Sequence, residues 1–150
     1  MAEHENEGGA DGAFCGCFGI GAGPALAVQP AGVFNLVGTW KNINPALANT
    51  VQVIITSDAN GFKVHTFGAC TPTPCDHGAV PALRYSKTVT SAIAHGLSAQ
   101  YNAGFATRIV TAQRIYDIDG GSFLELETRT RFAAGDTRQD YMRTELFVKQ

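Results

Sequence analysis

The chain has 150 residues, a formal net charge of -2 at pH 7, 45% hydrophobic residues and only 16% charged ones. Its length fits about one domain. The sequence contains no apolar run of about 18 residues, which argues against a transmembrane helix, and no basic surplus, which argues against a nucleic-acid-binding protein. The apolar fraction is too high for a chain that is disordered throughout.

The first 33 residues differ in composition from the rest. They hold eight of the 17 glycines, four acidic residues and no Lys or Arg, whereas residues 34–150 carry 11 basic and nine acidic side chains. We therefore expect a Gly/Ala-rich N-terminal arm over 1–33 and a β-barrel domain over 34–150. Either the arm is a flexible extension, or its apolar side chains pack on another surface, for example in a homo-oligomer formed through residues 12–33.

Beyond residue 33, runs of alternating polarity bounded by Gly, Asn, Asp and Pro predict β-strands. The expected strands span 36–42, 50–57, 62–68, 82–90, 96–102, 105–118, 122–132 and 137–148. Turn signals stand between them at Asn60-Gly61, Asn102-Ala103-Gly104, Asp119-Gly120 and Ala133-Ala134-Gly135. Eight strands joined mostly by hairpins form an antiparallel meander, and closing it removes the exposed edges. The sequence therefore predicts an all-β protein, an eight-stranded up-and-down barrel.

Two of the turns predict which residues face one another. A two-residue loop at Asp119-Gly120 pairs Ile118 with Gly121, and a three-residue loop over 133–135 pairs Phe132 with Asp136. The rows expected on the inner face are Ile115–Leu124–Thr144, Gln113–Leu126–Met142, Thr111–Thr128–Asp140 and Ile109–Thr130–Arg138. The expected outer face aligns Arg114, Glu125 and Arg143, with Glu127 beside Tyr141, and such opposite charges across strands favour this register.

The inner face predicted in this way is aliphatic near residue 119 and polar at the other end. A barrel of about eight strands is wide enough for side chains or for one small ligand, and apolar walls with a few polar groups are typical of small-molecule pockets. We expect a small hydrophobic ligand with one polar end, although threonines are also ordinary strand residues. The candidate ligand-binding residues are Trp40, Asn42, Tyr101, Thr111, Gln113, Thr128, Thr130, Arg138, Asp140 and Met142.

The segment from Leu36 to Asn42 (LVGTWKN) resembles the Gly-x-Trp first strand of the calycin barrels, which include the lipocalins and the avidin-like proteins. The resemblance covers this motif and the strand count over residues 34–150. It implies a calycin-like up-and-down barrel in which Trp40 helps to close one end. For the avidin-like proteins it implies ligand contacts only in the neighbourhood of Trp40, Lys41 and Asn42. Its own chemistry favours Trp40 as a core aromatic, because large aromatic side chains dominate core burial.

The segment from His65 to Gly78 holds two cysteines and two histidines. Cys70 and Cys75 either form a disulfide, stay reduced, or join His65 and His77 in a metal site. The spacing and order do not match a zinc-finger pattern, and the prolines between the cysteines stiffen a loop that suits a disulfide. The acidic N-terminus is unlike a secretory signal and suggests a cytoplasmic protein, whereas a disulfide suggests an oxidising compartment.

Motifs for catalysis are scarce in this sequence. It has no Ser nucleophile elbow, no phosphate-binding Gly loop and no H-E-x-x-H, so we expect no cofactor and assign no catalytic residue. A cofactor-free cyclase or isomerase could use Arg138 and Asp140, with Thr128 and Tyr101, at the barrel mouth. Three hypotheses follow: a small-molecule-binding barrel, an assembly protein whose arm docks on a neighbouring subunit, and a cofactor-free cyclase or isomerase.

Overall fold

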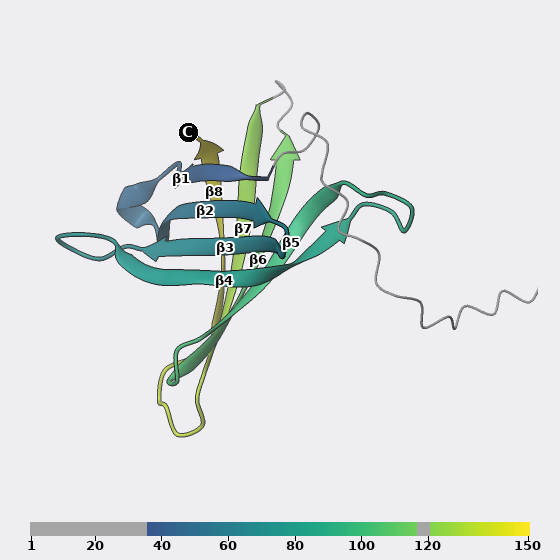
Figure 1. Ribbon diagram of the computed structural model, residues 1–150. Coiled ribbons are helices and arrows are strands. Elements are labelled where there is room, and N and C mark those ends of the chain that lie inside the picture. The colour runs from purple at the N-terminus through teal and green to yellow at the C-terminus, as the bar shows by residue number, and fades with distance from the viewer. Residues whose placement is uncertain (1–35, 117–120) are drawn as a thin grey trace, which may run out of the picture.

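The fold is a closed barrel of eight antiparallel strands. A computed structural model of the protein describes residues 36–116 and 121–150, and each strand pairs with the next while β8 pairs with β1 (Figure 1). The elements are β1 (Gly38–Asn42), η1 (Pro45–Leu47, a 3-10 helix), β2 (Thr50–Asp58), β3 (Gly61–Gly68), β4 (Cys75–Ser86), β5 (Ala94–Asn102), β6 (Ala106–Tyr116), β7 (Ser122–Phe132) and β8 (Tyr141–Lys149). The predicted all-β class and eight-stranded barrel are confirmed.

Two of the predictions fall outside the described residues. These are the N-terminal arm over 1–33, with its suggested role in a homo-oligomer, and the Asp119-Gly120 turn. Within the described ranges, no helix is long and apolar enough to cross a membrane.

The turn residues explain where several strands end. Asp58 pairs with Gly61, so Ala59 and Asn60 form a two-residue hairpin loop. The Asn60 amide donates to Asp58 Oδ1 at 2.7 Å, and Gly61 has a φ of +109°, which only glycine adopts readily. The β5–β6 connection likewise contains Gly104 at a φ of +77°. Local turn chemistry therefore fixes these hairpins.

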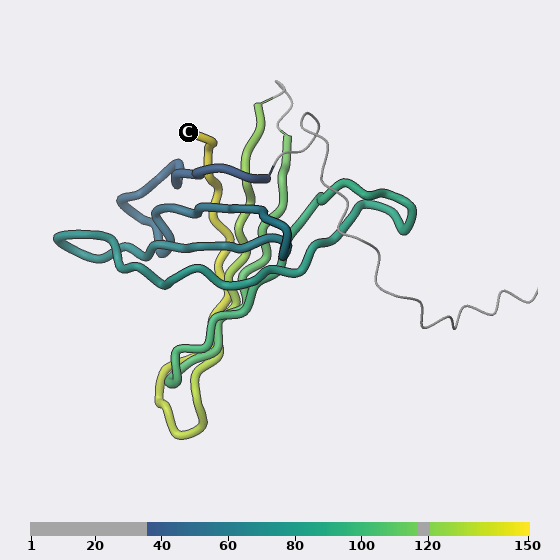
Figure 2. The backbone as a smooth tube through the Cα atoms, in the orientation of Figure 1, coloured from purple at the N-terminus to yellow at the C-terminus, as the bar shows by residue number. Residues whose placement is uncertain are grey.

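One end of the barrel, which we call the loop end, carries the connections 43–49, 69–74, 103–105 and 133–140. Figure 1 shows β1–β4 running across the direction of β6–β8, so that the first two connections lie at the left and the other two lie below. The tube in Figure 2 follows the same path and shows the β5–β6 and β7–β8 connections extending together. They touch, because the Ala133 amide donates to Phe105 O at 2.9 Å.

Away from the loop end the interior is an apolar core. Its fully buried side chains include Trp40, Ile55, Leu97, Leu124, Leu126 and Phe147. Each such side chain stabilises the fold by about 1.5–3 kcal/mol relative to an exposed one. The Trp40 indole N–H donates to Leu36 O at 2.8 Å, and the Lys149 ammonium lies 5.5 Å from the ring centroid. Trp40 is thus packed and hydrogen-bonded as a core aromatic.

The register between β6 and β7 differs by one residue from the prediction. Ile115 pairs with Phe123, whereas the two-residue loop predicted Leu124 opposite Ile115. Because successive side chains point to opposite faces, a shift of one residue moves every β6 side chain to the other face. Thr111, Gln113 and Ile115 therefore lie on the outer face. The inward β6 residues are Ala106, Arg108, Val110, Ala112 and Arg114, opposite a β7 inner face that the sequence predicted correctly.

The register between β7 and β8 differs by three residues. Leu126 pairs with Glu145, whereas the prediction placed Met142 there. The predicted turn exists, since the Asp136 amide donates to Ala133 O at 3.0 Å and Gly135 has a φ of +88°. This turn lies inside a longer connection, however, and β8 begins only at residue 141 rather than at 137. The buried inward residues of β8 are Glu145 and Phe147, while Met142 is 63% exposed on the outside.

The predicted charged outer row is wrong for the same reason. Glu125 does face outward, where it accepts a hydrogen bond from Gln113 Nε2 at 2.6 Å. Arg114 instead pairs with Leu124 and Arg143 with Thr128, both on the inward face. Glu127 pairs across the strands with Thr144 rather than with Tyr141.

Candidate functional site

Polar side chains from five successive strands meet inside the barrel at the loop end. Alternation along each strand aims them inward, next to buried apolar neighbours such as Val64 and Val110. We call this set the inner polar cluster: Thr66 on β3, His77 on β4, Tyr101 on β5, Arg108 on β6 and Thr130 on β7. Direct cross-strand pairing joins Tyr101 to Arg108 and Arg108 to Thr130.

His77 links the two halves of the cluster. Its Nδ1 lies 3.1 Å from Arg108 Nη1 and 3.1 Å from Thr66 Oγ1. The guanidinium can only donate, so Nδ1 accepts and the ring carries its proton on Nε2. A Cβ on Gly68 would come within 2.8 Å of the imidazole ring, which explains the glycine at this position.

The same surroundings favour the neutral form of His77. Burial is the main cause that lowers the pKa of His77, and the Arg108 guanidinium lowers it further. The Asp76 carboxylate acts in the opposite direction and the His65 ring adds to the lowering. A neutral imidazole is the state that accepts the hydrogen bond from Arg108.

Tyr101 is a buried member of the cluster. Its side chain is buried and its hydroxyl donates to Val64 O at 2.6 Å. Burial raises the pKa of Tyr101 above its ordinary value, so the phenol stays protonated. Hydrogen bonding with Thr66 acts in the opposite direction and lowers the pKa of Tyr101.

Two members of the cluster have unused hydrogen-bonding capacity. Thr130 is 4% exposed, and its Oγ1 has no hydrogen-bond partner among the described residues. Arg108 donates to His77, but none of the ion pairs within residues 36–116 and 121–150 includes it. Buried polar groups are normally satisfied, so the Thr130 hydroxyl is unusual.

Next to the cluster, the Glu145 carboxylate connects three segments of the chain through hydrogen bonds. The carboxylate accepts hydrogen bonds from the backbone amides of Asn49 at 2.7 Å and Thr50 at 3.1 Å, and from Asn42 Nδ2 at 3.4 Å. Arg143 lies 3.5 Å away and also donates to Leu47 O. Glu145 thus joins β8 to β1 and to the β1–β2 connection, and its charge is compensated.

No protein-family model matches the sequence, and no curated protein matches it either. A solved structure described as "X-ray structure of biotin binding protein from chicken" is similar, with 19% sequence identity and a TM-score of 0.49. The match covers 77% of this chain and 97% of that chain. A likeness of this degree carries no information on function, which must come from the residues of this chain.

The structure brings together only some of the predicted ligand-binding residues. Trp40, Asn42, Tyr101, Thr128 and Thr130 face inward and are buried. The Asn42 amide is already used, since Nδ2 donates to Thr50 O at 2.8 Å and Oδ1 accepts from the Asn44 amide at 2.8 Å. Thr111, Gln113 and Met142 lie on the outer face, away from this interior.

Arg138 and Asp140 do not form the predicted pair at the barrel mouth. Both lie in the exposed β7–β8 connection. Arg138 binds Asp136 at 2.7 Å, and Asp140 accepts a hydrogen bond from the Phe132 amide at 2.9 Å. The side chains proposed to assist a cyclase or isomerase are therefore not assembled with Thr128 and Tyr101.

Sequence reasoning missed three members of the inner polar cluster. Thr66 continues the alternation of Phe62 and Val64 along β3, and this pattern indicates that it faces inward. Arg108 was missed because the one-residue register error placed it outside. The sequence suggests His77 only as a metal ligand, because it lies close to Cys75 in the chain.

The predicted disulfide between Cys70 and Cys75 is present, with Cα atoms 5.3 Å apart. This bond rules out the alternative metal site, because both sulfurs are bonded to each other. Its two histidines also diverge: His65 lies 2.5 Å from the exposed Asp76 carboxylate, whereas His77 faces the interior.

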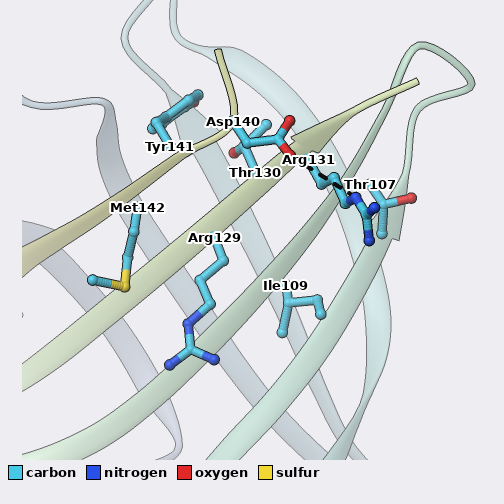
Figure 3. Close-up of a pocket in the computed structure, with 8 residues that line it drawn as sticks. All are labelled: Thr107, Ile109, Arg129, Thr130, Arg131, Asp140, Tyr141 and Met142. Carbon is cyan, nitrogen blue, oxygen red and sulfur yellow. Dashed lines mark ion pairs between the residues drawn. The ribbon is translucent and has the colours of Figure 1, made fainter. Parts of the chain in front are cut away.

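An open groove of about 600 Å³ lies over the outer face of β6–β8 (Figure 3). Ile109, Arg129 and Met142 lie side by side across the three strands. The charges in and beside the groove are compensated, because Arg129 binds Glu127 at 2.6 Å and Arg131 lies 3.9 Å from Asp140. Of the inner polar cluster, Thr130 alone also lines this groove, and Thr66, His77, Tyr101 and Arg108 do not.

Proposed function

We propose that this protein binds a small organic molecule non-covalently at the loop end of the barrel. The polar end of the ligand contacts the inner polar cluster, and its apolar part lies toward the neighbouring side chains Val64 and Val110. The observation that supports this proposal is the buried hydroxyl of Thr130, which has no partner in the described chain and lies beside Arg108.

The energetics favour binding over a purely structural role. Leaving a buried hydroxyl without a hydrogen bond costs about 1–3 kcal/mol, and a valine would fill the same space without that cost. A barrel that only needed to be stable gains nothing from Thr130. A ligand that accepts or donates a hydrogen bond there recovers the lost interaction.

The test is to record amide NMR spectra of the full chain with a library of small organic compounds. We expect at least one compound to shift the amide signals of Thr66, Tyr101 and Thr130 while signals at the Trp40 end stay in place. Thr130→Val should weaken binding of that compound, whereas the matched variant Thr107→Val, on the outer face, should not. A library in which no compound shifts these signals contradicts the proposal.

A further inference from the structure

Arg108 places a positive charge inside the barrel that no carboxylate of the described chain compensates. Its side chain donates to the imidazole of His77 at 3.1 Å, and this ring accepts the hydrogen bond as a neutral group. The side chain is half-buried, so water screens it less than a surface charge. Removing a charge from water without a charged partner is unfavourable.

The neighbouring charges at the loop end do not supply the missing partner. The Glu145 carboxylate is 6% exposed and is occupied by Arg143 and by the amides of Asn49 and Thr50. Asp76 binds His65 outside the barrel. Among residues 36–116 and 121–150, the positive charge of the inner polar cluster therefore has no carboxylate partner.

The donors that remain unused suit one particular group. A guanidinium has five N–H donors in a planar fork that matches the two oxygens of a carboxylate, and Arg108 uses Nη1 toward His77. The Thr130 hydroxyl on the adjacent strand provides one more donor. One positive charge balances a monoanion, whereas a phosphate dianion would keep an uncompensated negative charge.

We propose that the group bound at the inner polar cluster is the carboxylate of a small organic acid, with Arg108 as its charge partner and the Thr130 hydroxyl as a second donor. This inference rests on the function proposed above and specifies the class of ligand.

The experiment compares acids with neutral molecules of the same shape. Sodium hexanoate, decanoate and benzoate are titrated into the full chain at pH 7.5, alongside hexanol, decanol and benzyl alcohol, and amide NMR signals are followed. We expect at least one acid to shift Thr66, Tyr101 and Thr130 with a Kd lower than that of its alcohol by about tenfold to a hundredfold, as a charge-assisted hydrogen bond implies.

Two arginine variants identify the charge partner. Arg108→Gln should remove the preference for the acid. Arg114→Gln should keep it, because Arg114 is also half-buried on the inward face of β6 but lies at the far end of the barrel, where it donates to Ser122. If Arg108→Gln does not fold, the acid–alcohol comparison in the wild type and the shift of the Arg108 Nε–H signal still decide.

The outcomes separate this inference from the proposed function. Equal affinity for acids and alcohols, or an acid preference that survives in Arg108→Gln, overturns the carboxylate assignment and leaves a binding barrel. Binding of neutral library compounds without any acid does the same. Failure of every compound to shift the cluster signals overturns both.

Discussion

Replacing Glu145 by glutamine should destabilise the barrel strongly, because this side chain joins β8 to the β1–β2 connection. The carboxylate is 6% exposed and accepts the Asn49 and Thr50 amides at 2.7 and 3.1 Å. Glutamine keeps one acceptor oxygen but turns an amide group toward one of the two N–H donors. The variant thus loses one charge-assisted hydrogen bond and leaves a donor unpaired, which costs about 2–4 kcal/mol.

Urea unfolding followed by circular dichroism measures this loss. In a thermal melt of the same variant, we expect a melting temperature lower by roughly 6–12 °C, from the relation between unfolding free energy and melting temperature for chains of this size. Hydrogen exchange at the Asn49 and Thr50 amides should also become faster, since both donate to the carboxylate. Glu127→Gln is the matched control, because its partner Arg129 is exposed and exposed pairs contribute only about 0–1 kcal/mol. If the two variants differ by less than about 0.5 kcal/mol, the reasoning on Glu145 is wrong.

Three further changes test the interior. Thr130→Val should raise the free energy of unfolding by about 1 kcal/mol, since it removes an unpaired hydroxyl; a loss of stability in urea would show that the hydroxyl is bonded. The fold holds the pKa of His77 below its ordinary value, so its stabilising contribution is complete above that ordinary value and falls as pH drops through the lowered pKa. In urea unfolding measured at decreasing pH, His77→Asn should remove this part of the pH dependence, while Asp76 and Arg108 are kept. If the free energy of unfolding of the variant and of the wild type falls in parallel with pH, the prediction is wrong. Leu126→Ala, at a fully buried site, should cost about 2–5 kcal/mol in the same assay, and a cost below about 1 kcal/mol would show that the site is poorly packed.

The strand count could be predicted from this sequence because turn residues act locally. Ala59 and Asn60 form a two-residue hairpin loop before Gly61, and Gly104 and Gly135 adopt the positive φ that their turns require. The inner face of β7 could also be predicted, since Leu124 and Leu126 alternate with glutamates. In both cases the information lies within a few neighbouring residues.

The sequence does not predict which side chains of β6 and β8 face inward. This depends on the residue at which strand pairing begins again after each connecting loop. β6 carries aliphatic residues on both faces, with Ile109 and Ile115 outward and Val110 and Ala112 inward, so its alternation does not select a face. The inward face of β6 is then set by the length of the loop that joins it to β7. Because the side-chain period is two residues, an error of one or three residues inverts the face, and this error removed Arg108 from the predicted site.

The polar residues at the loop end differ in whether their hydrogen bonds are already made. Glu145 and Asn42 face inward, and their side chains are occupied by backbone amides, by a carbonyl and by each other. Arg108 and Thr130 face the same interior but keep donors unused within the described chain. Inward polarity alone therefore does not identify a binding residue, since half of this polar end serves to join the strands. The unused donors are the part of the site that a ligand can still satisfy.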